Sequence, residues 1–220
     1  MSTWIKRLAV AAVTAVPAGA AGYLGLVTGA VSLDLGIGRR SRPLGPQQVD
    51  VAAPREVVFD VIAQPYLGRA TRALAEKVRV LDRGADLVLA AHRTPIRGRL
   101  VTTTVETVTF HRPDRVGFRL VRGPVPHVTE EFLLDEHDCR TRLSYRGEMA
   151  ADLWRLGQWW ARVVGDRWEA TVAGSLDAIK AEAERRARTS KPSRWRHQAA
   201  RVRNRGEWVR TGRGAAAQRQ

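Results

Sequence analysis

The stretch VDVAAPREVVFDVIAQP, residues 49–65, decides the fold because its periodicity changes at a proline. In an extended chain Val49 and Val51 point to one side and Asp50 to the other, an alternation typical of a half-buried strand. From Pro54 onward the apolar residues recur at helical spacing. Proline suits the first turn of a helix, because the amide proton that it lacks has no partner there. The stretch therefore predicts a short strand followed directly by a short helix.

Six further strand-like runs follow this stretch, separated by glycine, proline or aspartate turn signals. Short turns between consecutive runs favour an antiparallel sheet, since antiparallel neighbours need no long crossover connection. With the opening strand, the sequence predicts an antiparallel sheet of about seven strands. The six further strands are predicted at residues 77–81, 86–92, 99–110, 115–121, 128–134 and 140–149.

One long amphipathic helix is predicted at the end of the domain. Residues 152–187 lack proline, and their apolar residues recur at helical spacing from Leu156 to Ile179. Asp152 is placed to cap the start of this helix. A strongly twisted sheet curls. A long helix on its concave face therefore leaves space beside it, and we expect an internal cavity.

Three stretches, together with this order of elements, resemble the SRPBCC superfamily of START, polyketide cyclase and birch-allergen-like proteins. They are VDVAAPREVVFDVIAQP, VTTTVETVTFHRPDRVGFRL at residues 101–120 and VTEEFLLDEHDCRTRLSYRGEM at residues 128–149. The resemblance covers roughly residues 46–187 and implies an α+β helix-grip fold, a curved antiparallel sheet wrapped on a long C-terminal helix. It also implies a hydrophobic pocket for a lipid, a polyketide or a similar small molecule. No cofactor is predicted.

Alternation along the predicted strands and the apolar stripe of the helix indicate which side chains line such a pocket. In RLSYRGEM, for example, Leu143, Tyr145 and Met149 share the face that we assign to the interior. The predicted ligand-binding residues are Phe118, Phe132, Leu143, Tyr145, Met149, Trp160 and Val164.

No specific catalytic signature is present: the sequence has no glycine-rich phosphate loop, no Gly-x-Ser-x-Gly and no His-Glu-x-x-His. Glu130, His92 and Tyr145 are weak candidates for catalytic groups. In an unbroken register Glu130 shares the inner face with Phe132, where burial raises the pKa of a carboxyl group; a β-bulge would turn it outward instead. The single cysteine, Cys139, excludes an intramolecular disulfide and a thiolate metal cluster, and no metal site is predicted.

The N-terminal region carries a long uncharged segment. Residues 8–33 are rich in Ala, Val, Leu and Gly and exceed the roughly 20 residues that a bilayer-spanning helix needs. They predict a transmembrane helix between a short flank, residues 1–7, and a basic linker, residues 34–45. A cleaved signal peptide, which would give a secreted protein, and a buried or peripheral helix are the alternatives. The distribution of flanking cations predicts a single-pass membrane protein with its globular domain in the cytoplasm.

The net charge of +15 lies on the flanks, because residues 44–187 carry only +2. This distribution argues against a basic groove within the fold. The tail, residues 188–220, is predicted to be disordered and rich in arginine. Its cations suit an anionic membrane surface better than nucleic acid, and a solvated tail without a partner is the third possibility. The sequence does not indicate an oligomeric state.

These observations lead to one hypothesis and two alternatives. The first is a membrane-tethered, non-enzymatic helix-grip domain that binds a hydrophobic small molecule in an internal cavity. The second is a polyketide cyclase or dehydratase-like enzyme, with Glu130, His92 and Tyr145 as its polar groups. The third is nucleic-acid association through the basic tail.

Overall fold

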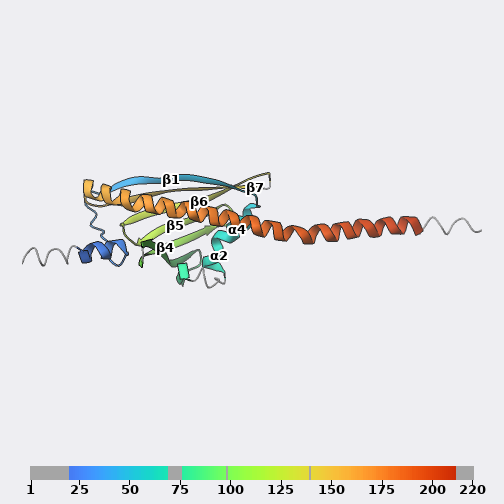
Figure 1. The fold of residues 1–220 in the computed structure, drawn as a ribbon, viewed down its shortest axis with the longest axis horizontal. Helices are drawn as coiled ribbons and strands as arrows, with labels where there is room; N and C mark the ends of the chain where they lie inside the picture. The colour runs from blue at the N-terminus through green and yellow to red at the C-terminus, as the bar shows by residue number, and fades with distance from the viewer. Residues whose placement is uncertain (1–19, 69–75, 98, 139, 212–220) are drawn as a thin grey trace, which may run out of the picture.

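The described part of the chain forms one seven-stranded antiparallel sheet in the order β1-β7-β6-β5-β4-β3-β2 (Figure 1). The computed structural model describes residues 20–68, 76–97, 99–138 and 140–211, with side chains as far as residue 189. Strands β2 to β7 pair with their neighbours in sequence, and β1 pairs with β7. The predicted antiparallel sheet is therefore confirmed. Its strands are β1 (Arg40–Val51), β2 (Val78–Arg83), β3 (Leu87–Arg97), β4 (Leu100–His111), β5 (Arg115–Arg122), β6 (His127–His137) and β7 (Arg140–Ala151).

The stretch at residues 49–65 forms the end of β1 and most of α2 (Arg55–Leu67). Pro54 is the N-cap residue of α2, and its carbonyl accepts the first amide hydrogen bonds of the helix. The predicted change from strand to helix at this proline is confirmed. Strand β1 begins at Arg40, within the predicted linker over residues 34–45, because its first residues already pair with the end of β7.

The closing helix, α4 (Trp154–Thr211), lies against the inner face of the sheet and packs mainly on β1, β7 and α2 (Figure 1). Because β1 and β7 lie at one edge of the sheet, inner side chains nearer the other edge, such as Phe110 and Phe118, stay half-buried. The buried contact consists of Ala161, Val172, Leu176, Ala183 and Ala187 from α4 and of Leu143, Tyr145 and Met149 from β7.

The start of α4 differs from the prediction, because Asp152 does not cap the helix. Its buried carboxylate accepts hydrogen bonds from the backbone amides of Leu35 (2.6 Å) and Gly36 (2.9 Å). The Arg39 guanidinium donates a third, at 2.7 Å, and this bond contributes most to lowering the pKa of Asp152 to about 2. Asp152 therefore attaches the N-terminal segment to the junction between β7 and α4.

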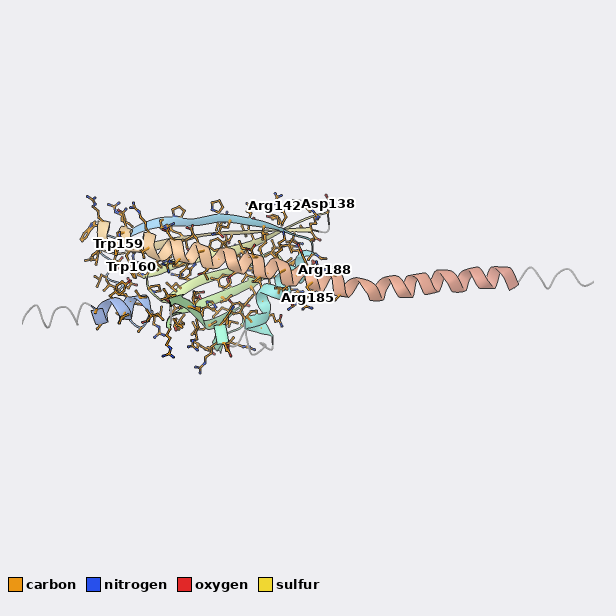
Figure 2. The ribbon with its side chains drawn as sticks, in the orientation of Figure 1. Asp138, Arg142, Trp159, Trp160, Arg185 and Arg188 are labelled. Carbon is orange, nitrogen blue, oxygen red and sulfur yellow. The ribbon has the colours of Figure 1, made fainter. Side chains whose placement is uncertain are left out.

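The C-terminal part of α4 also differs from the prediction. The helix continues to Thr211, through much of the tail over residues 188–220 that the sequence predicted to be disordered. Arg is frequent there and has high helix propensity, which the composition argument underrated. Figure 2 labels Arg185 and Arg188 near the point where the helix runs past the sheet. Residues 212–220 lie outside the described part.

The N-terminal segment packs against the domain. Residues 20–27 form a short helix, and the ring of Tyr23 lies 6.2 Å from that of Trp160, nearly perpendicular to it. Figure 2 shows Trp160 and its neighbour Trp159 near the start of α4. The carbonyl of Thr28 accepts a hydrogen bond from the Thr103 amide of β4 at 3.0 Å. The segment therefore contacts both the helix and the sheet.

The predicted single-pass membrane protein with a cytoplasmic domain is wrong, since no helix in the described part is long and apolar enough to span a bilayer. Within the predicted span, residues 8–33, the first twelve lie outside the described residues. The remainder folds onto the domain: the Ser32 hydroxyl donates to the Gly123 carbonyl at 2.9 Å and accepts from the Gly123 amide. An uncharged Ala- and Gly-rich composition suits packing against protein as well as against lipid.

We predict that Asp152→Ala lowers the free energy of unfolding by about 2 kcal/mol, because two backbone amides and a guanidinium lose their common acceptor. Asp34→Ala is the matched control: Asp34 pairs with the same Arg39 but is 62% exposed, so the loss should stay below about 1 kcal/mol. Urea denaturation at pH 7 measures both. Equal losses in the two variants would contradict the anchoring role of Asp152.

Candidate functional site

Glu130 on β6 points to the inner face of the sheet. It pairs with Phe118 on β5 and with Gly147 on β7, and neither pairing contains a register shift. The alternative of a β-bulge that turns Glu130 outward therefore does not apply. A Cβ atom at residue 147 would lie 2.8 Å from the Cβ of Glu130, closer than real Cβ atoms approach. Glycine at this position leaves room for the carboxyl side chain.

The carboxyl group of Glu130 is held by two donors on one oxygen. Tyr145 Oη donates to Oε2 at 2.6 Å, and Trp168 Nε1 of α4 donates to the same atom at 2.7 Å. The other oxygen, Oε1, has no hydrogen bond to any residue that the structure describes. We call Glu130, Tyr145 and Trp168 the Glu130 cluster.

Burial raises the pKa of Glu130 to about 7, and the nearby charge of Glu106 adds to this rise. The hydrogen bonds from Tyr145 and Trp168 act in the opposite direction and are outweighed. Near neutral pH, Glu130 therefore exists in comparable amounts as a carboxylate and as a neutral acid. Because Oε2 already accepts two hydrogen bonds, the proton of the acid resides on Oε1, where it can be donated to another molecule.

A second group of polar side chains lies on the same inner face. Its members are Tyr66 of α2, His92 of β3, and Thr104 and Glu106 of β4, and we call them the His92 cluster. His92 Nδ1 lies 2.8 Å from Glu106 Oε2, and His92 Nε2 lies 3.1 Å from Tyr66 Oη. Thr104 Oγ1 donates to Glu106 Oε1 at 2.8 Å. The four side chains thus form one hydrogen-bonded chain.

The ionisation of the His92 cluster follows from the balance between burial and charge. Burial by itself lowers the pKa of His92, but the charge of Glu106 and the hydrogen bond to it raise the pKa above its ordinary value. Burial raises the pKa of Tyr66 far above the ordinary value of a phenol, and the charges of Glu106 and Glu130 act in the same direction. The cluster therefore favours a protonated His92 beside an ionised Glu106 and a neutral Tyr66.

A row of aromatic rings connects the two clusters. The ring of Phe118 lies 6.1 Å from that of Tyr66 and 5.6 Å from that of Phe132, and the Phe132 ring lies 5.7 Å from that of Tyr145. The His92 ring lies 6.5 Å from Phe118. The inner face thus contains a row of Phe and Tyr rings, of which only Phe118 is half-buried and the others are buried, with a hydrogen-bonding cluster at each end.

The structure brings together some of the predicted ligand-binding residues and places others in the core. Phe118, Phe132 and Tyr145 belong to the aromatic row, in which Phe118 is half-buried and the other two are buried in the core. Leu143 and Met149 are 0% exposed beneath α4. The remaining two lie on α4: Trp160 donates Nε1 to the Pro124 carbonyl at 2.7 Å, and Val164 is half-buried. All seven stay predictions as ligand contacts.

The weak catalytic candidates divide between the clusters: Glu130 and Tyr145 belong to one, His92 to the other. The sequence reasoning missed the roles of Tyr66, Thr104, Glu106 and Trp168. The sequence could have indicated Glu106, because this residue alternates with Thr104 and Val108 on a strand whose inner face is apolar. Tyr66 carried no such signal, since its partner His92 lies 26 residues away on another element.

A hollow of about 740 Å³ lies mainly on the outer face of the sheet, opposite α4. Its lining includes Thr109, Arg119 and Arg146, which alternate with the inner residues of their strands. Arg146 forms an ion pair with Glu131 at 2.6 Å within this lining. The hollow is thus polar and open, and it is distinct from the internal cavity that the sequence led us to expect.

Among the described residues, no group of three or more His, Cys, Asp or Glu side chains is arranged to hold a metal ion. Cys139 lies outside the described part. The two clusters supply groups for hydrogen bonding and proton transfer on the inner face.

No family model matches the chain, and no curated protein matches it significantly. Solved structures, in contrast, match the chain over about two thirds of its length. The Zhui aromatase/cyclase from Streptomyces sp. R1128 is 20% identical with a TM-score of 0.56, covering 70% of this chain and 98% of its own. The di-domain ARO/CYC StfQ from the steffimycin biosynthetic pathway is 17% identical with a TM-score of 0.52, covering 68% and 52%. A norcoclaurine synthase point mutant from Thalictrum flavum is 12% identical with a TM-score of 0.51, covering 67% and 96%.

At these identities the comparisons establish the fold. The chain has a helix-grip fold, a curved antiparallel sheet with a long C-terminal helix, as its sequence patterns indicated.

We predict that the unfolding free energy of the wild-type protein falls as pH rises from 5 to 8, whereas that of Glu130→Gln lacks this component. A carboxyl whose pKa is raised from 4.5 unfolded to about 7 folded stabilises the fold below pH 4.5, and this contribution is lost as pH rises through 7. The difference in unfolding free energy between the wild type and Glu130→Gln should change by roughly 3 kcal/mol between pH 5 and pH 8. Urea denaturation at four pH values measures it, and parallel curves would refute the shift.

Proposed function

We propose that this protein binds a hydrophobic small molecule between the inner face of the sheet and α4, within a domain of residues 46–187. The observation that carries the proposal is Oε1 of Glu130, a carboxyl oxygen of a half-buried side chain beside aromatic rings, which has no hydrogen bond to any described residue. A ligand that covers this oxygen removes it from water, and this is costly unless the ligand supplies a hydrogen-bond partner in return.

The chemistry of the surface defines the class of ligand. Rings of Phe118 and Phe132 suit a flat apolar or aromatic body, and Glu130 Oε1 in its neutral form donates to a ketone, ester or phenol oxygen. A polyketide-like molecule or a lipid with a carbonyl group meets both requirements. Binding then weakens as pH rises through 7, because the ionised carboxylate no longer donates.

We predict that the fluorescent ketone 6-propionyl-2-dimethylaminonaphthalene binds the protein, and that Glu130→Leu weakens the binding at least tenfold at pH 6. Ten-fold corresponds to about 1.4 kcal/mol, the value of one buried hydrogen bond. Glu131→Leu is the matched control, because the neighbouring side chain points to the outer face and should change the affinity less than twofold. Fluorescence titration measures the three affinities, and equal affinities would exclude Glu130 as the anchor.

A second candidate function is a cyclase or dehydratase-like activity on a polyketide-like substrate, favoured by the similarity in fold to the Zhui aromatase/cyclase. In this role neutral Glu130 donates a proton to a carbonyl oxygen that is attacked by the enol form of a second ketone group of the substrate, and the enol releases its hydroxyl proton to water, from which Glu130 regains its own. A carbon–carbon bond forms, the carbonyl becomes a hydroxyl, and the proton count is unchanged. His92 and Tyr145 are the other polar groups proposed for this chemistry.

Glu130→Gln separates the two functions. The amide of glutamine donates and accepts hydrogen bonds in the same places as the neutral acid, so ligand binding should persist within about threefold and lose its pH dependence. It cannot transfer a proton, so turnover of a poly-β-ketone thioester should fall at least a hundredfold. Unchanged turnover would exclude Glu130 as the acid. Mass spectrometry measures product formation. If the wild type forms no product, the cyclase hypothesis is excluded.

A further inference from the structure

Within the described part of the chain, the His92 cluster leaves one of its hydrogen-bond donors, the Tyr66 hydroxyl, without an acceptor. Both oxygens of Glu106 are engaged, one by Thr104 and the other by His92. His92 is engaged at both nitrogens, by Glu106 and by Tyr66. Tyr66 Oη stands at the end of this chain, with a single hydrogen-bond partner among the described residues. The chain thus terminates in a hydroxyl group.

The direction of the hydrogen bonds follows from the charge state of the cluster. Glu106 beside Nδ1 requires a proton on that nitrogen, and Glu106 also favours the second proton on Nε2. Protonated Nε2 donates to Tyr66 Oη, so the hydroxyl oxygen accepts this bond and its own hydrogen points elsewhere. Tyr66 remains neutral, since its pKa is raised. The phenol is therefore a fixed donor.

A purely structural explanation of this cluster is unsatisfactory. Glu106 is 4% exposed, and burying an ion pair costs desolvation energy that apolar side chains of similar volume would avoid. The neighbouring inner positions Ala90 and Val108 are completely buried and apolar, so the sheet packs there without polar groups. A buried, hydrogen-bonded carboxylate–imidazole pair beside an aromatic surface is typical of a functional site.

We propose that Tyr66 Oη donates a hydrogen bond to a second oxygen atom of the bound molecule, at the end opposite to the oxygen held by Glu130. His92 and Glu106 are positioning residues that orient the Tyr66 hydroxyl. The ligand is then an elongated aromatic or polycyclic molecule with an oxygen acceptor near each end and rings that lie along Phe118 and Phe132. This inference rests on the proposed function and narrows its ligand class.

Two neutral probes test the proposal. 2-Acetylnaphthalene carries one oxygen acceptor, and 2-acetyl-6-methoxynaphthalene carries an acceptor at each end. We expect the wild type to bind the two-acceptor probe at least fivefold more tightly at pH 6.5, and Tyr66→Phe to abolish this preference. The variant keeps the ring that contacts Phe118 and removes only the hydroxyl. Its affinity for the one-acceptor probe should stay within twofold of the wild-type value.

Two further variants complete the test. Tyr23→Phe is the matched control, because it removes a hydroxyl from a residue that is 56% exposed and packs on Trp160, and the probe preference should persist. Glu106→Gln should reduce the preference and, in ¹⁵N NMR of the imidazole, convert His92 from the doubly protonated to the neutral form at pH 6.5. A neutral His92 in the wild type would overturn the assigned direction of the hydrogen bonds.

The outcomes separate the two proposals. If the wild type binds the one-acceptor probe but shows no preference for the second, or if Tyr66→Phe weakens both probes equally, the role of Tyr66 is refuted and the proposed function stands. If the wild type binds neither probe, the proposed function fails and this inference fails with it. Urea denaturation of Tyr66→Phe checks that the variant is folded.

Discussion

The packing of α4 on the β1–β7 edge of the sheet is the constraint on which the rest of the structure depends. It brings Trp168 from the helix within 2.7 Å of the same carboxyl oxygen that Tyr145 reaches from β7. A helix and a strand thus converge on one atom of Glu130. The contact also leaves the inner face toward β3 and β4 uncovered by α4, and there the half-buried rings of Phe110 and Phe118 meet Tyr66 of α2 instead.

Burial acts on the two clusters in opposite ways. An exposed glutamate is ionised at neutral pH, but among apolar rings the charged form loses its hydration, and Glu130 retains a proton into the neutral range. The same loss of hydration disfavours a charged His92, and the adjacent Glu106 reverses it. One cluster therefore holds a proton because it is buried, and the other because it contains a carboxylate. Both present a donor to the aromatic surface between them.

The N-terminal segment shows why composition can mislead. Its uncharged residues satisfied the length criterion for a bilayer span, yet the part that the structure describes is attached to the domain through polar contacts. The backbone amides of Leu35 and Gly36 donate hydrogen bonds to Asp152, and the Ser32 hydroxyl donates one to the Gly123 carbonyl. Hydropathy averages over side chains and contains no information about such backbone partners. A segment that is apolar in composition can therefore pack against the surface of its own domain.

Local periodicity determined a large part of this structure from the sequence. The change of period at Pro54, the alternating strands and the helical spacing after Trp154 define the elements. Alternation on β6 gave an inner and an outer position for Glu130 as alternatives, and the uninterrupted register of the structure decided for the inner one. Only the tertiary structure decided which polar groups meet. Tyr66 and His92 are 26 residues apart, and Glu130 and Trp168 are 38 apart. Their contacts depend on how α2 and α4 dock on the sheet, and periodicity within one element carries no information about its rotation and translation relative to another.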